Sequence, residues 1–254
     1  MNILKFNLSS NFAYFQDKVN IRNNISYPSI HRPSILGILG AILGLEGFNK
    51  IKENGLIKYI EELSSVEVGI VINSDINYTK VTTNDSTSLN ITNTKNRLTQ
   101  KYENILNSPN FDIFLKIDNI DLFNKILNVL VNKEYIYEPT LGKSYFFATI
   151  KNVENCILND KKNLELVEED LVFSASLFPS TLLPELGGET YSNLFASNGL
   201  KMGRKFTLPI SSDKKNGEYN NYVNFSFNNF IIADDIINDS SYHNIDNKLI
   251  YFSK

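Results

Sequence analysis

Basic and hydroxyl-bearing residues gather at the start of an apolar, glycine-containing run, in an arrangement that suits phosphate binding. His31, Arg32 and Ser34 precede or open the run, Gly37 lies within it, and Arg22 lies upstream. The N-terminus of a helix binds anions because its first amide groups are unpaired and point at the ligand. We therefore predict that these residues contact a phosphate backbone, and that the glycine allows its close approach.

Three further basic residues follow glycines elsewhere in the chain. Lys143 comes after Gly142, and Arg204 and Lys205 come after Gly203. We predict that they are additional phosphate partners, although a solvated surface charge is the competing interpretation for each residue taken alone. Base stacking, with core packing as its alternative, is considered for three aromatic residues: Tyr14, Phe15 and Tyr27.

The apolar run itself is predicted to be a buried helix. Pro33 and Ser34 suit its first turn, and Gly47 is available for a left-handed residue at its end. Glycines 37, 40 and 44 would share one side, each at a cost of about 1 kcal/mol against alanine. The run is too short to span a membrane, which takes about 20 residues. No lysine–serine pair follows the glycines, which argues against a phosphate-binding loop.

Composition limits the classes of function. The chain has 254 residues, 42% of them hydrophobic and 21% charged, which is ordinary for a globular protein with one large domain or two small ones. Its net charge of −3 argues against a protein that binds nucleic acid unaided, but allows a subunit with a local basic groove.

Metal, disulfide and cofactor chemistry have no support in the sequence. Cys156 is the single cysteine, and the two histidines add no metal-site spacing. The first ten residues lack the basic head and apolar block of a signal peptide. We expect no metal, no cofactor, no membrane contact and a cytoplasmic protein.

The order of predicted elements indicates an α+β fold. Residues 1–151 are predicted to contain strand, helix, strand, strand, helix and strand, which is the order of a ferredoxin-like domain. These elements, with an extra helical segment after the glycine helix, are expected at residues 3–8, 35–45, 48–63, 65–73, 111–117, 119–131 and 145–150. The strand at 65–73 has a nearly continuous apolar run, which favours an interior position in the sheet.

Two regions depart from this pattern. Residues 74–100 are rich in Asn, Thr and Ser, so they cannot contribute much to a core and are predicted to be an insertion. Residues 152–254 are predicted to form a smaller β-rich domain without a long helix. Its short β-prone runs are at residues 171–176, 206–210, 221–227 and 248–252.

The glycine helix and its surroundings resemble a known family. The run from Ser34 to Gly44 after an opening strand is similar to the start of the CRISPR-associated Cascade subunit that caps the 5′ end of the guide RNA, the fifth Cas family. The approach Phe12-Ala13-Tyr14-Phe15 and the segment Tyr137-Glu138-Pro139-Thr140-Leu141-Gly142-Lys143 are similar as well. The C-terminal half matches more weakly, and the type I-B kind is the most similar variant.

This resemblance implies a fold and a role. It implies an RNA-recognition-type (ferredoxin-like) domain with an inserted thumb-like hairpin, here at about residues 74–108, and a C-terminal β-domain. It implies a non-catalytic subunit of a type I Cascade that binds the 5′ handle of crRNA in antiviral defence. Its partners would be the backbone subunit, the large subunit and, through the guide duplex, target DNA.

Two other functions stay open at this point. In one branch of the family the subunit cuts precursor crRNA without metal, and His31 and His243 are the histidines available as proton acceptors. A protein-binding module with a ferredoxin-like fold and no RNA is the other alternative, favoured by the acidic net charge.

Overall fold

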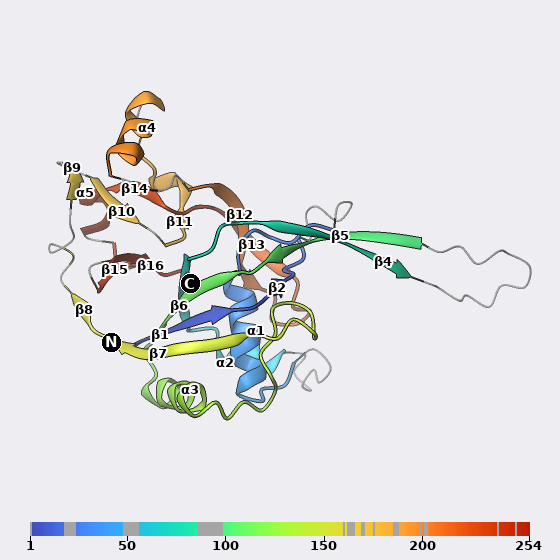
Figure 1. Cartoon of the computed structure of the whole chain (residues 1–254). Coiled ribbons are helices and arrows are strands. Elements are labelled where there is room, and N and C mark those ends of the chain that lie inside the picture. Colours follow the sequence, from blue (N-terminus) through green and yellow to red (C-terminus); the bar gives the residue numbers. More distant parts are fainter. Residues whose placement is uncertain are drawn as a thin grey trace, which may run out of the picture.

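The computed structural model describes residues 2–17, 24–47, 56–85, 99–159, 161, 166–168, 171–174, 176–184, 188–198, 200, 203–237, 239–246 and 248–254. Figure 1 shows a body of packed sheets and helices from which one long hairpin projects. No helix in these ranges is both long and apolar enough to cross a membrane.

A four-stranded antiparallel sheet organises the N-terminal part of the chain. Its strands lie in the order β3-β6-β1-β7, and two helices, α1 and α3, follow β1 and β6 in the chain. This order and connectivity are those of a ferredoxin-like domain, so the predicted α+β fold is confirmed. The bounds are β1 Asn2–Ser9, α1 Arg32–Ile42, β3 Glu67–Ile72, β6 Asn110–Ile117, α3 Ile120–Asn132 and β7 Thr149–Cys156.

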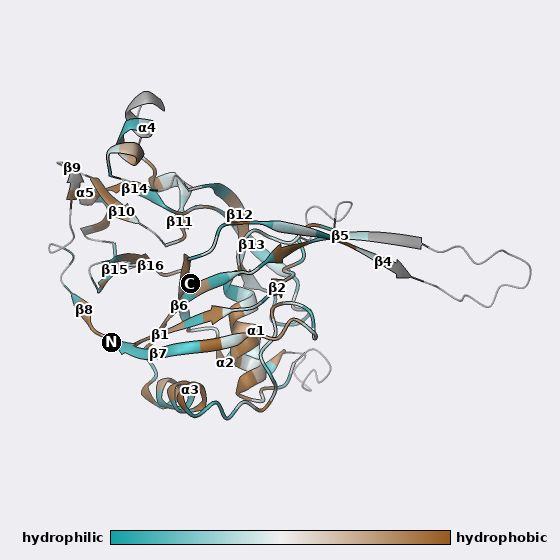
Figure 2. Ribbon diagram, viewed as in Figure 1, coloured by the Kyte–Doolittle hydropathy of each residue, from teal (hydrophilic) through white to brown (hydrophobic). Residues whose placement is uncertain are grey.

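The two faces of this sheet are covered unequally. Alternate residues of β1 point to opposite sides, and Leu4, Phe6 and Leu8 are buried on one side, whereas Ile3 is the only β1 residue buried on the other. Leu4 and Leu8 belong to the main core, which includes the apolar sides of α1 and α3. Ile3 packs instead with Ile250 and Phe252 from the C-terminal end of the chain. Figure 2 shows the hydrophobic colouring along most of α1, as expected of a helix buried on most sides.

A hairpin is inserted between β3 and β6. Its strands are β4 Tyr78–Asp85 and β5 Thr99–Asn107, and the short strand β2 Phe12–Ala13 pairs with β5 near its base. The hairpin therefore occupies the predicted insertion. Lys95 and Arg97, two basic residues of this insertion, lie outside the described residues.

The described residues of the C-terminal part form three small sheets, with the orders β14-β10-β9, β11-β13-β12 and β16-β15-β8. The four predicted β-prone runs correspond to β10, β12, β13 and β16. The bounds are β8 Leu158–Asn159, β9 Leu166–Glu168, β10 Leu171–Ser174, β11 Phe178–Pro179, β12 Lys205–Ser212, β13 Tyr219–Ser226, β14 Asn229–Ile232, β15 Tyr242–Ile245 and β16 Lys248–Tyr251.

The last residues return to the first sheet. Ser253 forms a bridge to Val68 of β3, and Ser176 forms another to Val71. Strand β7 continues to Cys156, so the predicted domain boundary at residue 151 falls inside this strand.

Three helix predictions differ from the structure. Helix α1 ends at Ile42 and the left-handed residue is Gly44, with φ of 68°, so the predicted end near Gly47 is wrong. Of the segment predicted at 48–63, residues 56–63 are described. The helix α2 covers Lys58–Glu62 of this part, and Leu56 and Ile57 precede its first turn. The C-terminal region also contains two helices that were not predicted, α4 Gly188–Ser197 and α5 Ala233–Ile237. Because α4 is largely polar, its sequence has no apolar stripe that would predict a helix.

Two strand predictions need correction. Strand β3 is at an edge of the four-stranded sheet, yet all six of its residues are buried because the bridges from Ser176 and Ser253 cover its outer side. The strand predicted at 145–150 runs from Thr149 to Cys156 instead. The aromatic run before it forms a turn, in which Leu141 donates to the carbonyl of Phe146 at 2.8 Å.

Candidate functional site

The predicted phosphate seat at the start of α1 is occupied by the protein itself. The Arg32 side chain donates to the carbonyl oxygens of Ser64 at 2.8 Å, Val66 at 2.9 Å and Ile210 at 3.2 Å, and the residue is 6% exposed. Burial lowers its pKa, and the charge of Glu67 partly offsets this. The expectation that Arg32 binds RNA phosphate is therefore corrected: it joins α1 to the segment before β3 and to β12.

His31 also serves the fold. It is the N-cap of α1, where its Nδ1 accepts a hydrogen bond from the amide of Ser34 at 3.3 Å. Its ring packs edge-on against those of Tyr27 and Tyr219, at centroid distances of 5.4 and 4.8 Å, and the residue is 1% exposed. A side chain so enclosed is not available to RNA, which corrects its predicted role.

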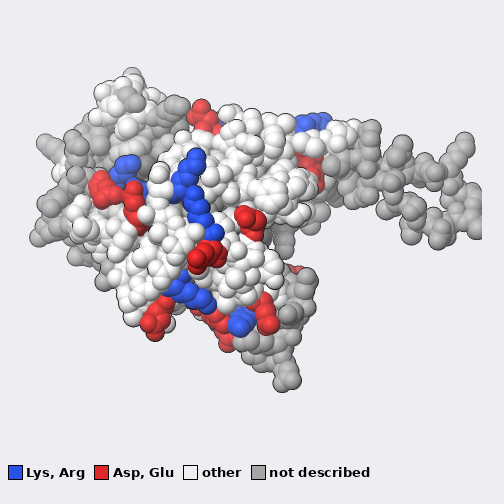
Figure 3. Space-filling view, turned by 60° about the horizontal axis from the view of Figure 1, so that its bottom comes forward, with Lys and Arg blue, Asp and Glu red and all other residues white. Residues whose placement is uncertain are grey.

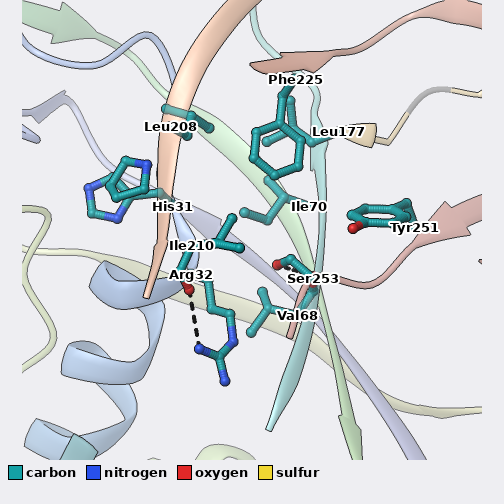
Figure 4. A pocket seen from close by; sticks show the side chains of 11 residues that line it. His31, Arg32, Val68, Ile70, Leu177, Leu208, Ile210, Phe225, Tyr251 and Ser253 are labelled. Atoms are coloured by element: carbon teal, nitrogen blue, oxygen red, sulfur yellow. Dashed lines mark hydrogen bonds between the residues drawn. The ribbon is translucent and has the colours of Figure 1, made fainter. Parts of the chain in front are cut away.

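The void beside these residues is too small for a ligand. Figure 4 shows His31 and Arg32 at its edge, with aliphatic and aromatic side chains from β3, β12 and β13 around it. Its volume is about 10 Å³, which is the space of one water molecule. It is a packing gap within the core.

A larger groove lies along the outer flank of α1. It has a volume of about 350 Å³ and is open to solvent. The helix positions that are not buried are 34, 37 and 41, and they carry the small residues Ser34, Gly37 and Ala41, all of which line this groove. A ligand in the groove would thus touch the helix with little side-chain bulk between. The remaining lining residues are Phe15, Pro33, Ile38, Tyr59, Thr140, Gly142, Gly217 and Tyr219.

The three glycines of the α1 region lie in three different environments. A Cβ on Gly40 would lie 2.7 Å from the Cβ of Tyr59, so this glycine lets α2 approach α1. Gly44 has a positive φ after the helix end. A Cβ on Gly37 would meet no atom within 4 Å, so of these three glycines Gly37 is the one that faces the open groove.

A second cavity, of about 180 Å³, adjoins the groove, since Pro33 and Tyr59 line both. It brings positive charge close to the start of α1 through Lys214 and Lys254, and the buried Arg32 forms part of its wall. Lys254 also lies 3.1 Å from Glu67. Burial raises the pKa of Tyr59 to about 12, so its hydroxyl stays neutral at pH 7. A neutral groove that continues into a basic cavity suits a base or sugar beside a phosphate.

Lys143 has a partner within the protein. It forms an ion pair with Glu103 of β5, and its ammonium lies 4.7 Å from the Tyr14 ring centroid. Partial burial lowers the pKa of Lys143, but the hydrogen bonds and charges of Glu103 and Tyr145 outweigh it and raise the pKa overall. The preceding Gly142 lies in the groove wall with φ of 91°, where a Cβ would come 1.8 Å from the Tyr14 carbonyl oxygen. The Lys143–Glu103 ion pair thus links the loop that forms the groove wall to the hairpin.

The remaining predicted residues are apart from the groove or outside the description. Arg204 and Lys205 are exposed near the start of β12, and neither lines the groove. Arg22 lies outside the described residues. On the face seen in Figure 3, basic and acidic side chains are interspersed, without a continuous basic patch among the residues shown in colour.

Sequence reasoning missed the residues that complete the groove from distant segments. Tyr59 comes from α2, and Thr140 from the loop after α3. Gly217 lies in the turn between β12 and β13, and Tyr219 is the first residue of β13. The spacing of small residues at 34, 37 and 41 was the available signal, because i, i+3 and i+7 share one side of a helix. Of the aromatic residues considered for stacking, Phe15 and Tyr27 are core residues, each 3% exposed, and Tyr14 is 8% exposed.

Comparison with known proteins gives a likeness of fold. No protein-family profile and no curated protein sequence matches the chain. A solved chain described as "CRISPR RNA-guided surveillance complex" matches with a TM-score of 0.50, 12% identity and 92% of each chain covered. A "Cas protein" crystal structure (TM-score 0.48, 10% identity, 91% of this chain and 96% of that one) and a CRISPR protein from Archaeoglobus fulgidus (0.48, 8%, 100% of each) are also similar. The chain therefore shares its α+β fold with a chain from an RNA-guided complex.

Proposed function

We propose that this protein is a non-catalytic subunit of a type I CRISPR surveillance complex that binds the 5′ handle of crRNA. The observation that carries the proposal is the neutral groove over Ser34, Gly37 and Ala41 with the basic cavity beside it. Single-stranded RNA needs pockets for unstacked bases together with donors to its phosphates. The fold shared with the surveillance-complex chain supports the same assignment.

The handle contacts in this proposal differ from those predicted from the sequence. The RNA lies along the flank of α1, over Gly37, instead of at its buried first turn. Ser34, in the groove lining, donates to the RNA, and Lys214 provides charge for a phosphate. The backbone and large subunits of the complex, and target DNA through the guide duplex, are the proposed partners.

The proposal includes no RNA cleavage. General acid–base attack by a 2′-hydroxyl needs a proton acceptor within hydrogen-bond reach of the RNA. His31 is enclosed by aromatic rings, and burial lowers the pKa of His243 to about 4. Both properties support a binding role in preference to metal-independent endoribonuclease activity.

The test uses the assembled complex with its crRNA. The tagged chain is co-expressed with the other subunits and a repeat-containing precursor RNA, and the RNA that co-purifies is sequenced and quantified. We expect Gly37→Leu to reduce crRNA retention severalfold, because leucine suits a helix yet fills the groove. Lys214→Glu should reduce retention and make the remaining retention less sensitive to salt, since one contact between a cation and a phosphate is lost.

The matched control is Asn124→Leu, which places the same side chain on an exposed position of α3. Retention in this variant should equal that of the unmodified chain. If Gly37→Leu also retains crRNA fully, the groove does not hold the handle. If the unmodified chain purifies without RNA or other subunits, the protein-binding module becomes the better description. Specific cutting of repeat RNA by the purified chain in EDTA would favour the nuclease.

A further inference from the structure

One side of the projecting hairpin carries two exposed tyrosines with a lysine between them. Tyr78 and Tyr102 are 41% and 46% exposed. Tyr78 and Lys80 are two residues apart on β4, so they point to the same side. Tyr102 of β5 is opposite Thr82 in the register, which places it on that side as well. We call Tyr78, Lys80 and Tyr102 the tyrosine face.

Two members of this face, Lys80 and Tyr102, are in contact. The Lys80 ammonium lies 4.3 Å from the Tyr102 ring centroid, a cation–π distance. The Tyr78 hydroxyl donates to the carbonyl of Ser26 at 3.3 Å, which holds its ring at the base of the hairpin. Partial burial raises the pKa of Tyr78 to about 12, so its hydroxyl stays neutral at pH 7.

The other side of the hairpin is engaged by the protein. Val81 and Ile105 pack there with Tyr14 and Phe146. Glu103, which shares that side by strand alternation, pairs with Lys143. The charge of the Asp17 carboxylate contributes to the raised pKa of Tyr78. The tyrosine face is thus the side on which the two rings and Lys80 remain exposed.

We propose that the tyrosine face binds the unpaired bases of a single-stranded nucleic acid, which stack on Tyr102 and Tyr78 while Lys80 contacts the phosphates. Aromatic rings stack any base through its π-face, and flanking cations follow the backbone. An exposed cation between two exposed rings favours a polyanion with planar groups over an uncharged protein surface. The inference rests on the proposed function, and it adds a second contact region on the hairpin strands.

The test measures binding of labelled oligonucleotides to the full-length protein by fluorescence anisotropy. The probes are single-stranded RNA and DNA of 12 uridines or thymidines, and an abasic strand of the same length. We expect Tyr102→Ala to weaken binding of both base-containing strands about tenfold, to leave abasic binding unchanged, and Tyr102→Phe to bind normally. Lys80→Ala should weaken all three strands and lower the salt slope by about one.

Tyr137→Ala is the matched control, because Tyr137 is 63% exposed and is not part of the hairpin. The control should bind like the unmodified protein. Stronger binding of RNA than of DNA assigns the face to the guide strand, and the reverse assigns it to a displaced DNA strand. Equal binding of Tyr102→Ala and the unmodified protein would overturn the inference. Because crRNA retention by the assembled complex is measured separately, that failure would leave the proposed function standing.

Discussion

The start of α1 and the tyrosine face use similar residue types in opposite ways. At the helix start, Arg32 donates to three carbonyl groups and His31 lies among aromatic rings, and both are nearly inaccessible. On the hairpin, by contrast, Tyr78, Lys80 and Tyr102 are exposed. Residue type therefore predicts a capacity to bind, whereas burial and existing partners decide whether the group is available.

Removal of Arg32 would test the comparison most strongly. Arg32→Ala should lower the free energy of unfolding by about 3 kcal/mol, because the carbonyls of Ser64, Val66 and Ile210 lose a charged donor. Urea denaturation measures the change. Arg204→Ala, at an exposed arginine, should change stability by less than about 0.5 kcal/mol. Unchanged stability of Arg32→Ala together with lost RNA binding would return Arg32 to the RNA site.

His243 provides a prediction for the pH dependence of stability. Burial, with the charges of Lys116 and Lys161, lowers its pKa from 6.5 to about 4, while Glu67 raises it. The unfolded chain then binds more protons than the folded one between these values, so stability falls as pH falls through this window. We expect a loss of about 2 kcal/mol between pH 7 and pH 5.

The check is a series of urea transitions at several pH values. His243→Gln should flatten the pH dependence even if the variant is less stable overall, so the slope is the informative quantity. An unchanged slope in that variant would show that other groups cause the acid sensitivity.

The glycines of α1 allow a sharper contrast within one helix. Gly40→Ala should destabilise the protein by about 1–2 kcal/mol, because its Cβ meets Tyr59 at 2.7 Å. Gly37→Ala should stabilise it by about 1 kcal/mol, because the new Cβ meets no atom within 4 Å and alanine favours the helix. Thermal unfolding distinguishes the two, and effects of the same sign would contradict the assignment of Gly37 to the open groove.

Shortening of the hairpin should have the smallest effect on stability. Replacing residues 83–101 by Asn-Gly joins Thr82 to Tyr102, which are paired in the register, by a two-residue turn. Stability should change by less than about 1 kcal/mol, since the retained residues include the packed Val81 and Ile105. Engagement of target DNA by the complex, measured by gel shift, should nevertheless weaken. A loss of solubility would show that the removed part supports the fold.

Much of the fold followed from local patterns. Asn119 caps α3, and Phe123, Ile126 and Leu130, spaced three and four residues apart, are buried along one side of this helix. Alternation of apolar residues is the corresponding local signal in β1 and β6, which were expected at residues 3–8 and 111–117. Such signals are readable because each depends on residues only a few positions apart.

Long-range contacts decided the rest. The burial of β3 at a sheet edge needs Ser253, and the end of the predicted 145–150 strand moved because pairing with β1 sets the register of β7. The groove is also long-range, since Gly217 and Thr140 reach α1 only in the folded chain. Glycine spacing along α1 indicated a close approach, but the sequence could not say that Gly40 meets a helix while Gly37 faces open space. Local periodicity determines which residues form an element, and only packing determines which of its sides remains uncovered.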